Sequence, residues 1–208
     1  MNILIIPDVH GRTFWRYAVN VINDYDKVIF LGDYLDPYPQ ENISFEKALS
    51  ELSEIIAFHN KYPDKVITLL GNHDLHYLFN DVIPCWRFNA MYSKQANELL
   101  NKLDLKIINI IDNYLFSHAG ITNDWLKDYK ISIEDLEKKP ISSLISKLTA
   151  VGIKRGGRAK CGSCIWCDIE EFMLSDCNKD YYQIFGHTQL RTDPLIFSDR
   201  LLLRNSSI

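Results

Sequence analysis

The sequence lacks any apolar stretch long enough to span a bilayer, and its charges are not predominantly positive. The first absence predicts a protein without a membrane-spanning helix. The second, a formal net charge of −4 over 208 residues, gives no electrostatic basis for general binding to nucleic acid or to an anionic membrane surface. We therefore expect any attraction for a phosphate group to be local to one site.

The chain has only five cysteines, and it shows no export signal. An odd number of cysteines fits free thiols better than a disulfide framework. The first apolar run, Asn2–Ile6, follows Met1 directly, which leaves no charged segment, apolar region and cleavage site of a signal peptide. We therefore expect a cytoplasmic protein in a reducing compartment.

Three of the cysteines, Cys161, Cys164 and Cys167, form a C-x-x-C-x-x-C pattern. On spacing alone, this pattern could bind zinc or an iron–sulfur cluster. Because no second CxxC pair follows, we favour thiols that pack in the interior over a metal site.

Internal repeats, low-complexity tracts and linkers are also absent, and with 47% apolar residues we expect one domain over residues 1–208. Short apolar runs alternate with segments of helical period, which predicts an α/β fold whose strands are buried on both faces. Ser44 is the predicted N-cap of the longest helix. The predicted strands are Asn2–Ile6, Val28–Leu31, Val66–Leu70, Lys106–Ile111, Tyr114–Phe116 and Tyr182–Phe185, and the predicted helices are Phe14–Asn23, Ser44–Asn60, Ser93–Leu103, Ile141–Ala150 and Asp168–Leu174.

Acids, an amide and imidazoles gather in five short motifs that follow predicted strands. Carboxylate oxygen and neutral imidazole nitrogen are the ligands that two neighbouring divalent cations need. Because open α/β sheets collect ligands at the carboxyl ends of their strands, we expect the motifs to converge. Each motif alone could be turn chemistry, but the ordered set holds four of the six histidines and favours a metal site. The motifs are DVHG (Asp8–Gly11), GDYLD (Gly32–Asp36), GNHD (Gly71–Asp74), SHAG (Ser117–Gly120) and GHT (Gly186–Thr188).

In this order, the motifs resemble those of the calcineurin-like metallophosphoesterases, and within them those of the serine/threonine phosphoprotein phosphatase branch. That branch carries GDxHG, GDYVDRG, GNHE, HGG and a late histidine. The segment Ile165–Asp168 is similar to its LWSD segment, and the resemblance extends from Met1 to about Leu190. It implies a central β-sandwich flanked by helices, an α/β (α+β) fold with a dinuclear metal site at the carboxyl ends of the strands.

The resemblance implies two divalent metal ions, with manganese as the first choice and iron, zinc or nickel as alternatives. Two divalent cations minus two carboxylates leave a net positive centre, because imidazole and amide ligands are neutral. Such a centre would attract a phosphate dianion into an acidic chain. The first three of the implied ligands would hold one metal, and the third, Asp33, would bridge it to the second. The six ligands are Asp8, His10, Asp33, Asn72, His118 and His187.

The resemblance also implies the course of the reaction. A hydroxide that bridges the metals would attack phosphorus directly, so that no protein nucleophile is required. His73 would protonate the leaving oxygen, and Asp36 would orient His73. His76 matches no ligand position, and we expect it at the rim of the site.

The chain departs from the family pattern in its arginines. Pro37 stands where the phosphatase branch has the arginine of GDYVDRG, so one phosphate-binding guanidinium is missing. The second arginine of that branch falls in a stretch that this chain largely lacks. We expect replacement donors from Arg155 or Arg158 in the glycine-rich segment Lys154–Gly162, with a solvated basic loop as the alternative.

The C-terminal end departs from the family as well. Relatives continue after the last histidine through a hairpin of strands, whereas here Leu195–Phe197 and Leu201–Leu203 are followed at once by Asn205–Ile208. This difference predicts a last strand that is short or truncated.

Together these features predict a metal-dependent phosphoesterase that hydrolyses phosphomonoesters, in phosphoproteins or in small molecules. A dinucleoside polyphosphate hydrolase is the enzymatic alternative, because small members with this motif set include such enzymes. A protein-binding module with a vestigial site is the non-enzymatic alternative, which the complete ligand set disfavours and the missing arginines leave open. The implied partner is a phosphorylated substrate, and the sequence does not determine the oligomeric state.

Overall fold

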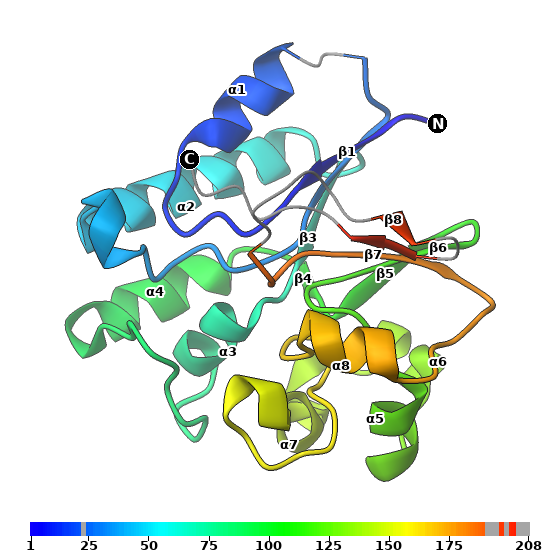
Figure 1. Cartoon of the computed structure of the whole chain (residues 1–208). Coiled ribbons are helices and arrows are strands. Elements are labelled where there is room, and N and C mark those ends of the chain that lie inside the picture. Colours follow the sequence, from blue (N-terminus) through cyan, green and yellow to red (C-terminus); the bar gives the residue numbers. More distant parts are fainter. Residues whose placement is uncertain (22–23, 190–195, 198–199, 203–208) are drawn as a thin grey trace. The chain divides into compact units, whose positions relative to one another are not determined.

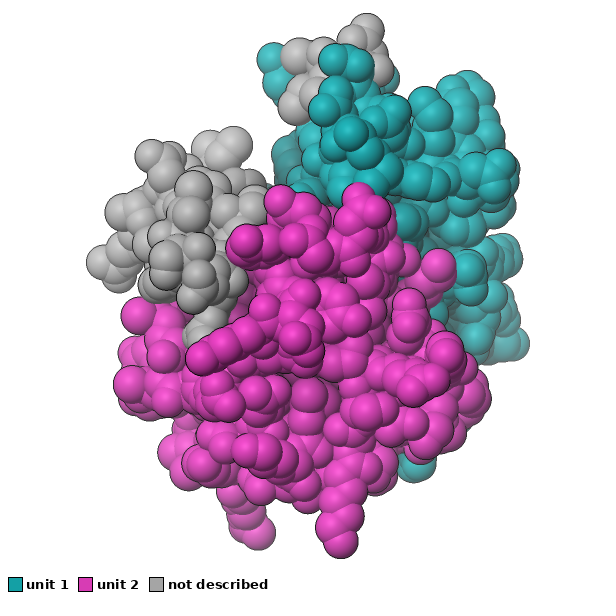
Figure 2. Space-filling view, turned by 90° about the vertical axis from the view of Figure 1, so that its right-hand side faces the viewer, with its two compact units in different colours: residues 1–105 teal, residues 106–208 magenta. Residues whose placement is uncertain are grey.

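Two units, residues 1–105 and 106–208, make up the chain (Figure 2). The structure is a computed structural model that describes residues 1–21, 24–189, 196–197 and 200–202. Each unit has its own sheet (Figure 1). The single domain expected over residues 1–208 stays a prediction.

The sheet of the first unit is built from apolar strands whose carboxyl ends lie at one edge. β1 pairs with β2, and β2 pairs with β3, both in parallel, so that Ile29 of β2 has Ile5 and Ile67 as its neighbours. Both faces of a parallel sheet are normally covered by other parts of the protein, and Val28 and Phe30 are fully buried, as this arrangement requires. The strands run in the order β1 (Ile3–Ile6), β2 (Lys27–Phe30), β3 (Val66–Leu69) and β4 (Leu105–Lys106).

Helix α2 contributes the largest apolar face to the first core. Its predicted N-cap is confirmed, because the Oγ of Ser44 accepts a hydrogen bond from the amide of Lys47 at 3.2 Å. Leu49, Leu52 and Ile55 recur at helical spacing and pack into the cluster that also holds β2. The helices of this unit are α1 (Phe14–Val21), α2 (Phe45–Lys61), α3 (Asn72–Leu78) and α4 (Ser93–Leu100), with 3-10 turns η1 (Pro39–Glu41) and η2 (Ala90–Tyr92).

The second unit is organised around a mixed sheet of order β5-β6-β7-β9-β8 (Figure 1). β6 pairs with β7 and β7 with β9 in parallel, whereas β5–β6 and β8–β9 are antiparallel. The strands are β5 (Ile108–Ile111), β6 (Tyr114–Ser117), β7 (Tyr182–Phe185), β8 (Ile196–Phe197) and β9 (Arg200–Leu202). The helices are α5 (Asn123–Asp128), α6 (Ile133–Lys138), α7 (Ile145–Leu148) and α8 (Ile169–Leu174), with 3-10 turns η3 (Ile141–Ser143) and η4 (Ile153–Arg155).

The predicted α/β class and the predicted strands are confirmed, with two kinds of difference. The run Lys106–Ile111 divides between β4 and β5, and the helix expected over Ile141–Ala150 divides into η3 and α7. Three short helices, α3, α5 and α6, were not predicted, because each has too few residues to show a helical period. The end of the helix expected over Phe14–Asn23 and the terminal segment Asn205–Ile208 lie partly or wholly outside the described residues.

Within the part of the chain that the structure describes, no helix combines the length and the apolar character needed to cross a membrane.

Close packing of α2 against the DVHG turn generates a prediction about Gly11. Gly11 has φ +74°, and a Cβ at this position would lie 2.7 Å from the Cβ of the buried Ala48. We expect Gly11→Ala to lower the free energy of unfolding by about 2–3 kcal/mol, from backbone strain and overpacking together. Denaturant titration measures this loss.

Gly156→Ala is the matched control, since Gly156 has a similar φ of +80° but open space around it. Its loss should be about 1 kcal/mol, from backbone strain alone. If the two variants lose the same free energy of unfolding, the contact with Ala48 adds nothing to the cost of Gly11→Ala.

Candidate metal centre

Three of the predicted ligands meet in the first unit, in the turns that follow β1 and β2. Nε2 of His10 lies 4.0 Å from Oδ2 of Asp8 and 3.6 Å from Oδ2 of Asp33. Nδ1 of His10 lies 2.7 Å from the carbonyl oxygen of Leu35, which can only accept, so Nδ1 carries the proton. Burial, followed by the charge of His73, holds the pKa of His10 well below its usual value. A neutral imidazole therefore directs a lone pair toward two carboxylates, which is the donor set of a divalent metal.

The charge balance around Asp33 also fits a bound cation. Burial, then the charges of Asp8 and Asp74, raise the pKa of Asp33 well above its usual value. The side chains of Asp8 and Asp33 offer oxygens within 4.8 Å of each other, and both residues are buried. Like charges this close in the interior are costly without compensation, and two oxygens and an imidazole nitrogen suit a hard or borderline divalent ion.

The backbone at these ligands is strained. His10, Asp33 and Asp36 all have positive φ, at +46°, +54° and +60°. Each such residue costs about 1–2 kcal/mol, and strain of this kind gathers at functional sites. The turns are joined to each other, because the amides of Val9 and His10 both donate to the carbonyl oxygen of Asp33, at 3.0 and 2.8 Å.

Asp74 holds the site together and was not recognised from the sequence. Its Oδ2 accepts hydrogen bonds from the amides of Asp33 and Gly71, both at 2.9 Å, and its Oδ1 accepts one from Tyr34 at 3.0 Å. Burial raises the pKa of Asp74 to about 6, although these three amides act in the opposite direction. The only sequence signal was its place in GNHD, where the resembled branch has glutamate.

The predicted acid and its orienting carboxylate are in contact within the same unit. Nδ1 of His73 lies 2.7 Å from Oδ2 of Asp36, and the hydroxyl of Tyr77 donates to Oδ1 of Asp36 at 2.5 Å. Burial would raise the pKa of Asp36, but hydrogen bonds from His73, His76 and Tyr77 outweigh it and lower the pKa. Asp36 is therefore an ionised acceptor that fixes His73 with Nδ1 protonated and Nε2 directed away from it.

The expectation that His76 lies at the rim of the site is wrong. Its side chain is buried, and its Nε2 lies 3.1 Å from Oδ2 of Asp36. Its Nδ1 accepts a hydrogen bond from the amide of Cys85 at 3.2 Å. His76 faces inward because it follows His73 by three residues in α3, which places both side chains on the same side of the helix. The sequence could have suggested this from the i, i+3 spacing, had α3 been predicted.

Asn72, the fourth predicted ligand of this unit, begins α3 and is buried. Its Nδ2 donates to the sulfur of Cys85 at 3.7 Å. The following amide, of His73, donates to Oδ1 of Asp33 at 2.8 Å, so the start of α3 is hydrogen-bonded directly to the predicted bridging carboxylate.

The remaining predicted ligands, His118 and His187, lie next to each other in the second unit. Nε2 of His118 is 3.0 Å from Nδ1 of His187. His118 directly follows β6, and His187 is the second residue after β7. The amide of Gly186 donates to the carbonyl oxygen of His118 at 2.8 Å. His187 has φ +67°, and its ring meets that of Trp166 edge-on at 6.0 Å. Parallel neighbouring strands thus bring the SHAG and GHT motifs together, as predicted.

Arg155 is engaged with residues of its own unit. Its Nε lies 2.8 Å from Oδ2 of Asp168, and its Nη2 donates to Oγ1 of Thr188 at 2.8 Å. Arg158 is exposed. The substrate-binding role expected for these two arginines stays a prediction.

The glycine-rich segment around them is held by Glu171. The amides of Lys154 and Gly162 donate to its carboxylate at 2.9 and 2.8 Å.

The cysteine pattern packs in the interior. Cys161, Cys164 and Cys167 are buried free thiols, and burial raises the pKa of Cys164 and Cys167 above the usual value. Over the described ranges, no group of three cysteines lies close enough to hold a metal ion. The arrangement agrees with packing thiols.

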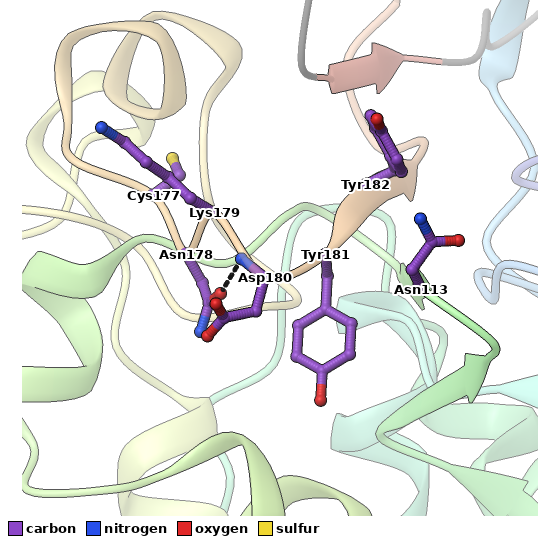
Figure 3. Close-up of a pocket in the computed structure, with 7 residues that line it drawn as sticks. All are labelled: Asn113, Cys177, Asn178, Lys179, Asp180, Tyr181 and Tyr182. Atoms are coloured by element: carbon purple, nitrogen blue, oxygen red, sulfur yellow. Dashed lines mark hydrogen bonds between the residues drawn. The ribbon is translucent and has the colours of Figure 1, made fainter.

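A pocket of about 370 Å³ in the second unit holds none of the predicted site residues (Figure 3). It is lined by Asn113 and residues 177–182, and one hydrogen bond within it joins the amide of Asp180 to Oδ1 of Asn178 at 2.7 Å. Its mixed polar lining brings no cluster of acids, imidazoles or arginines together. We assign no role to it.

Each unit thus brings together side chains of the kinds that bind divalent metals in hydrolases. The sequence model of the calcineurin-like phosphoesterases matches residues 1–190, and the chain belongs to this family. Membership confirms the predicted enzyme class, a hydrolase of phosphoester bonds, and the predicted use of divalent metals. No curated protein matches the sequence.

Solved structures share the fold at low sequence identity. A cold-active protein-tyrosine phosphatase of a psychrophile, Shewanella sp., is 14% identical with a TM-score of 0.56, over 98% of this chain and 71% of that chain. A protein serine/threonine phosphatase from Saccharomyces cerevisiae, with similarity to human phosphatase PP5, is 12% identical with a TM-score of 0.58, over 97% of this chain and 66% of that chain. The likeness confirms the predicted metallophosphoesterase fold.

The three amides that Asp74 holds generate a prediction. Asn at this position keeps one acceptor oxygen and places an NH2 group where N–H donors point, so at least one buried amide loses its partner. We expect Asp74→Asn to lower the free energy of unfolding by about 2 kcal/mol, measured by denaturant titration. Asp135→Asn, in the solvent-exposed capping box of α6, is the control, and it should lower the free energy of unfolding much less. A loss at Asp74 no greater than at Asp135 would contradict the role.

Proposed function

We propose that the protein is a two-metal phosphomonoesterase that uses direct attack of water on phosphorus. The observation that carries the proposal is the buried group of Asp8, His10 and Asp33, with the acid pair of His73 and Asp36 beside it. The rings of His10 and His73 lie 5.2 Å apart, edge to face, so the metal-type ligands and the proton donor share one site.

The proposed ligands are those that the order of the motifs implies. Asp8, His10 and Asp33 would hold one metal, and Asp33 would bridge to a second metal held with Asn72, His118 and His187. The order of the motifs supports this assignment, together with the adjacency of the residues inside each unit. Manganese is the proposed metal, and a cytoplasmic location is proposed from the free thiols.

When bound, two divalent cations lower the pKa of a water molecule and neutralise the phosphoryl oxygens. The protein then has to supply a proton to the leaving oxygen. His73 suits this task, because Asp36 accepts from Nδ1 and leaves Nε2 to face the leaving group. Asp36 also stabilises the imidazolium while the proton is held, and Tyr77 keeps Asp36 in place.

The substrate is proposed to be a phosphomonoester, with phosphoproteins included. The two similar structures support this range, since one is a protein-tyrosine phosphatase and the other a protein serine/threonine phosphatase. Dinucleoside polyphosphate hydrolysis and a vestigial binding module remain the alternatives to be tested.

Removal of metal should abolish activity. We expect the chelated protein to be inactive toward aryl phosphate and to recover on addition of manganese, with a rise in Tm as the buried carboxylates gain a counter-charge. Asp33→Asn should lower activity more than about a hundredfold, since it removes the bridge. Asp81→Asn, at an exposed position, is the control. Full activity after exhaustive chelation, with metal analysis confirming an empty site, would refute the mechanism.

The substrate class is tested on a panel of metal-reconstituted reactions with phosphopeptide, nucleotide, diadenosine tetraphosphate and aryl phosphodiester. Faster turnover of the phosphomonoesters supports the proposal. Preference for diadenosine tetraphosphate would favour the dinucleoside polyphosphate hydrolase, and no turnover with any metal would favour the binding module.

The role of His73 is tested by the leaving group. We expect His73→Asn to lower the rate on an alkyl phosphate by roughly 10²–10⁴-fold and to affect a nitrophenyl ester much less, because nitrophenolate leaves without a proton. Metal content should be unchanged, whereas Asn72→Ala should reduce it. Equal losses on both esters, or loss of metal from the His73 variant, would contradict the assignment.

A further inference from the structure

We infer that Arg87 is the guanidinium that binds the phosphoryl group of the substrate, a step that rests on the proposed phosphoesterase function. Arg87 lies outside all five motifs, in the segment between α3 and α4. Its Nη2 is 3.3 Å from Nε2 of His73, and its Nε donates to the carbonyl oxygen of Asp36 at 2.9 Å. It therefore contacts both members of the acid pair.

The position of the guanidinium suits a phosphoryl group. Because Nδ1 of His73 donates to Asp36, Nε2 of the neutral imidazole accepts from Arg87 in this structure. In the proposed reaction Nε2 carries the proton for the leaving oxygen, so the N–H group of Arg87 that it releases turns to the phosphoryl group. A phosphoryl group whose leaving oxygen lies at Nε2 places its non-bridging oxygens beside the Nη atoms of Arg87. Planar N–H groups of this kind bind such oxygens in pairs.

Arg87 also has unused capacity for an anion. Arg12 is paired with Glu41 at 2.8 Å, and Arg155 with Asp168 at 2.8 Å, so each has its counter-charge. Among the described residues, no carboxylate lies within ion-pairing distance of Arg87. Its partners are instead a carbonyl oxygen, an imidazole and the ring of Tyr38, whose centroid is 3.9 Å from Cζ. A half-buried cation held by neutral groups is ready to receive a negative ligand.

The same arginine opens onto a surface pocket of about 330 Å³ in the first unit. Its other walls are mostly apolar and include Pro37, Pro39, Phe45 and Trp86, of which Trp86 is 76% exposed. The pocket gives the guanidinium access from solvent and leaves room for the group that the phosphate esterifies. Pro37 lines this pocket too, so Arg87 supplies a guanidinium beside the position where the motif lacks one.

The backbone of Arg87 supports a functional constraint. Arg87 has φ +77°, a conformation that non-glycine residues rarely adopt. A strained backbone at a residue whose partners are neutral indicates that its side chain has to lie at this particular position. Lysine carries the same cost at a positive φ as arginine. A lysine variant therefore tests the loss of the guanidinium group separately from any change in backbone strain.

The experiment compares Arg87→Lys, Arg87→Met, Arg155→Lys and the control Arg16→Lys in the manganese-loaded protein. Arg16 is an ion-paired residue of α1 outside the site, with Glu51 2.8 Å away. Calorimetry gives the Kd of inorganic phosphate, and metal analysis gives the manganese content. Kinetics give kcat/KM for an aryl phosphomonoester and an aryl phosphodiester.

We expect both Arg87 variants to weaken phosphate binding and monoester kcat/KM by about tenfold or more, or about 1.4 kcal/mol, with manganese content unchanged. The diester, with one negative charge less, should lose less. Arg16→Lys should stay within about twofold of wild type, because lysine keeps a positive charge beside Glu51 and Arg16 lies outside the site. Arg155→Lys measures the alternative, in which Arg155 binds the phosphoryl group.

Four results would overturn the inference. Wild-type protein that binds no phosphate, or Arg87 variants that bind it as tightly as wild type, would leave the guanidinium without a ligand. Loss of manganese together with phosphate would make Arg87 a support of the metal site. Weakened phosphate binding in Arg155→Lys alone would return the role to that residue. If no ester is hydrolysed but the Arg87 variants lose phosphate affinity, the proposed function fails and the inference stands.

Discussion

The carboxylate of Asp74 is the contact on which the first unit's site depends. It joins the turn after β2 to the start of α3 by accepting the amides of Asp33, Tyr34 and Gly71. The carbonyl oxygen of Asp33 then accepts two amides from the turn after β1. Three turns that follow three separate strands are thereby held as one body. Ligands on such turns keep their geometry only if the supporting hydrogen bonds do.

Charge divides the buried aspartates of this body into two kinds. Burial and neighbouring carboxylates raise the pKa of Asp33, and burial raises that of Asp74. Asp36 differs, because donors from His73, His76 and Tyr77 lower its pKa despite burial. Asp36, which accepts from His73, orients that imidazole, whereas Asp33, beside the charges of Asp8 and Asp74, suits a bound cation. The same side chain thus serves two purposes according to its neighbours.

The polar network around Asp36 extends beyond the motifs that first drew attention to the site. His76 and Tyr77 come from the body of α3, and Arg87 comes from the segment after it. Together they contact the acid pair of His73 and Asp36. The candidate site therefore combines residues of the five motifs with residues that lie outside them.

The sequence by itself determined the strands, the α/β class and a set of candidate ligands. Buried strands can be recognised from apolar runs, because a run of apolar residues is a local property of the sequence. The motifs that follow these strands combine residue types that are seldom needed together except to bind metals. The sequence did not determine the roles of Asp74, His76 and Arg87. Asp74 acts on Asp33 and Tyr34, far away in the sequence, and Arg87 reaches Asp36 only because the segment after α3 turns back with φ +77°. Such contacts depend on backbone geometry and packing between distant segments, so only the tertiary structure decided them.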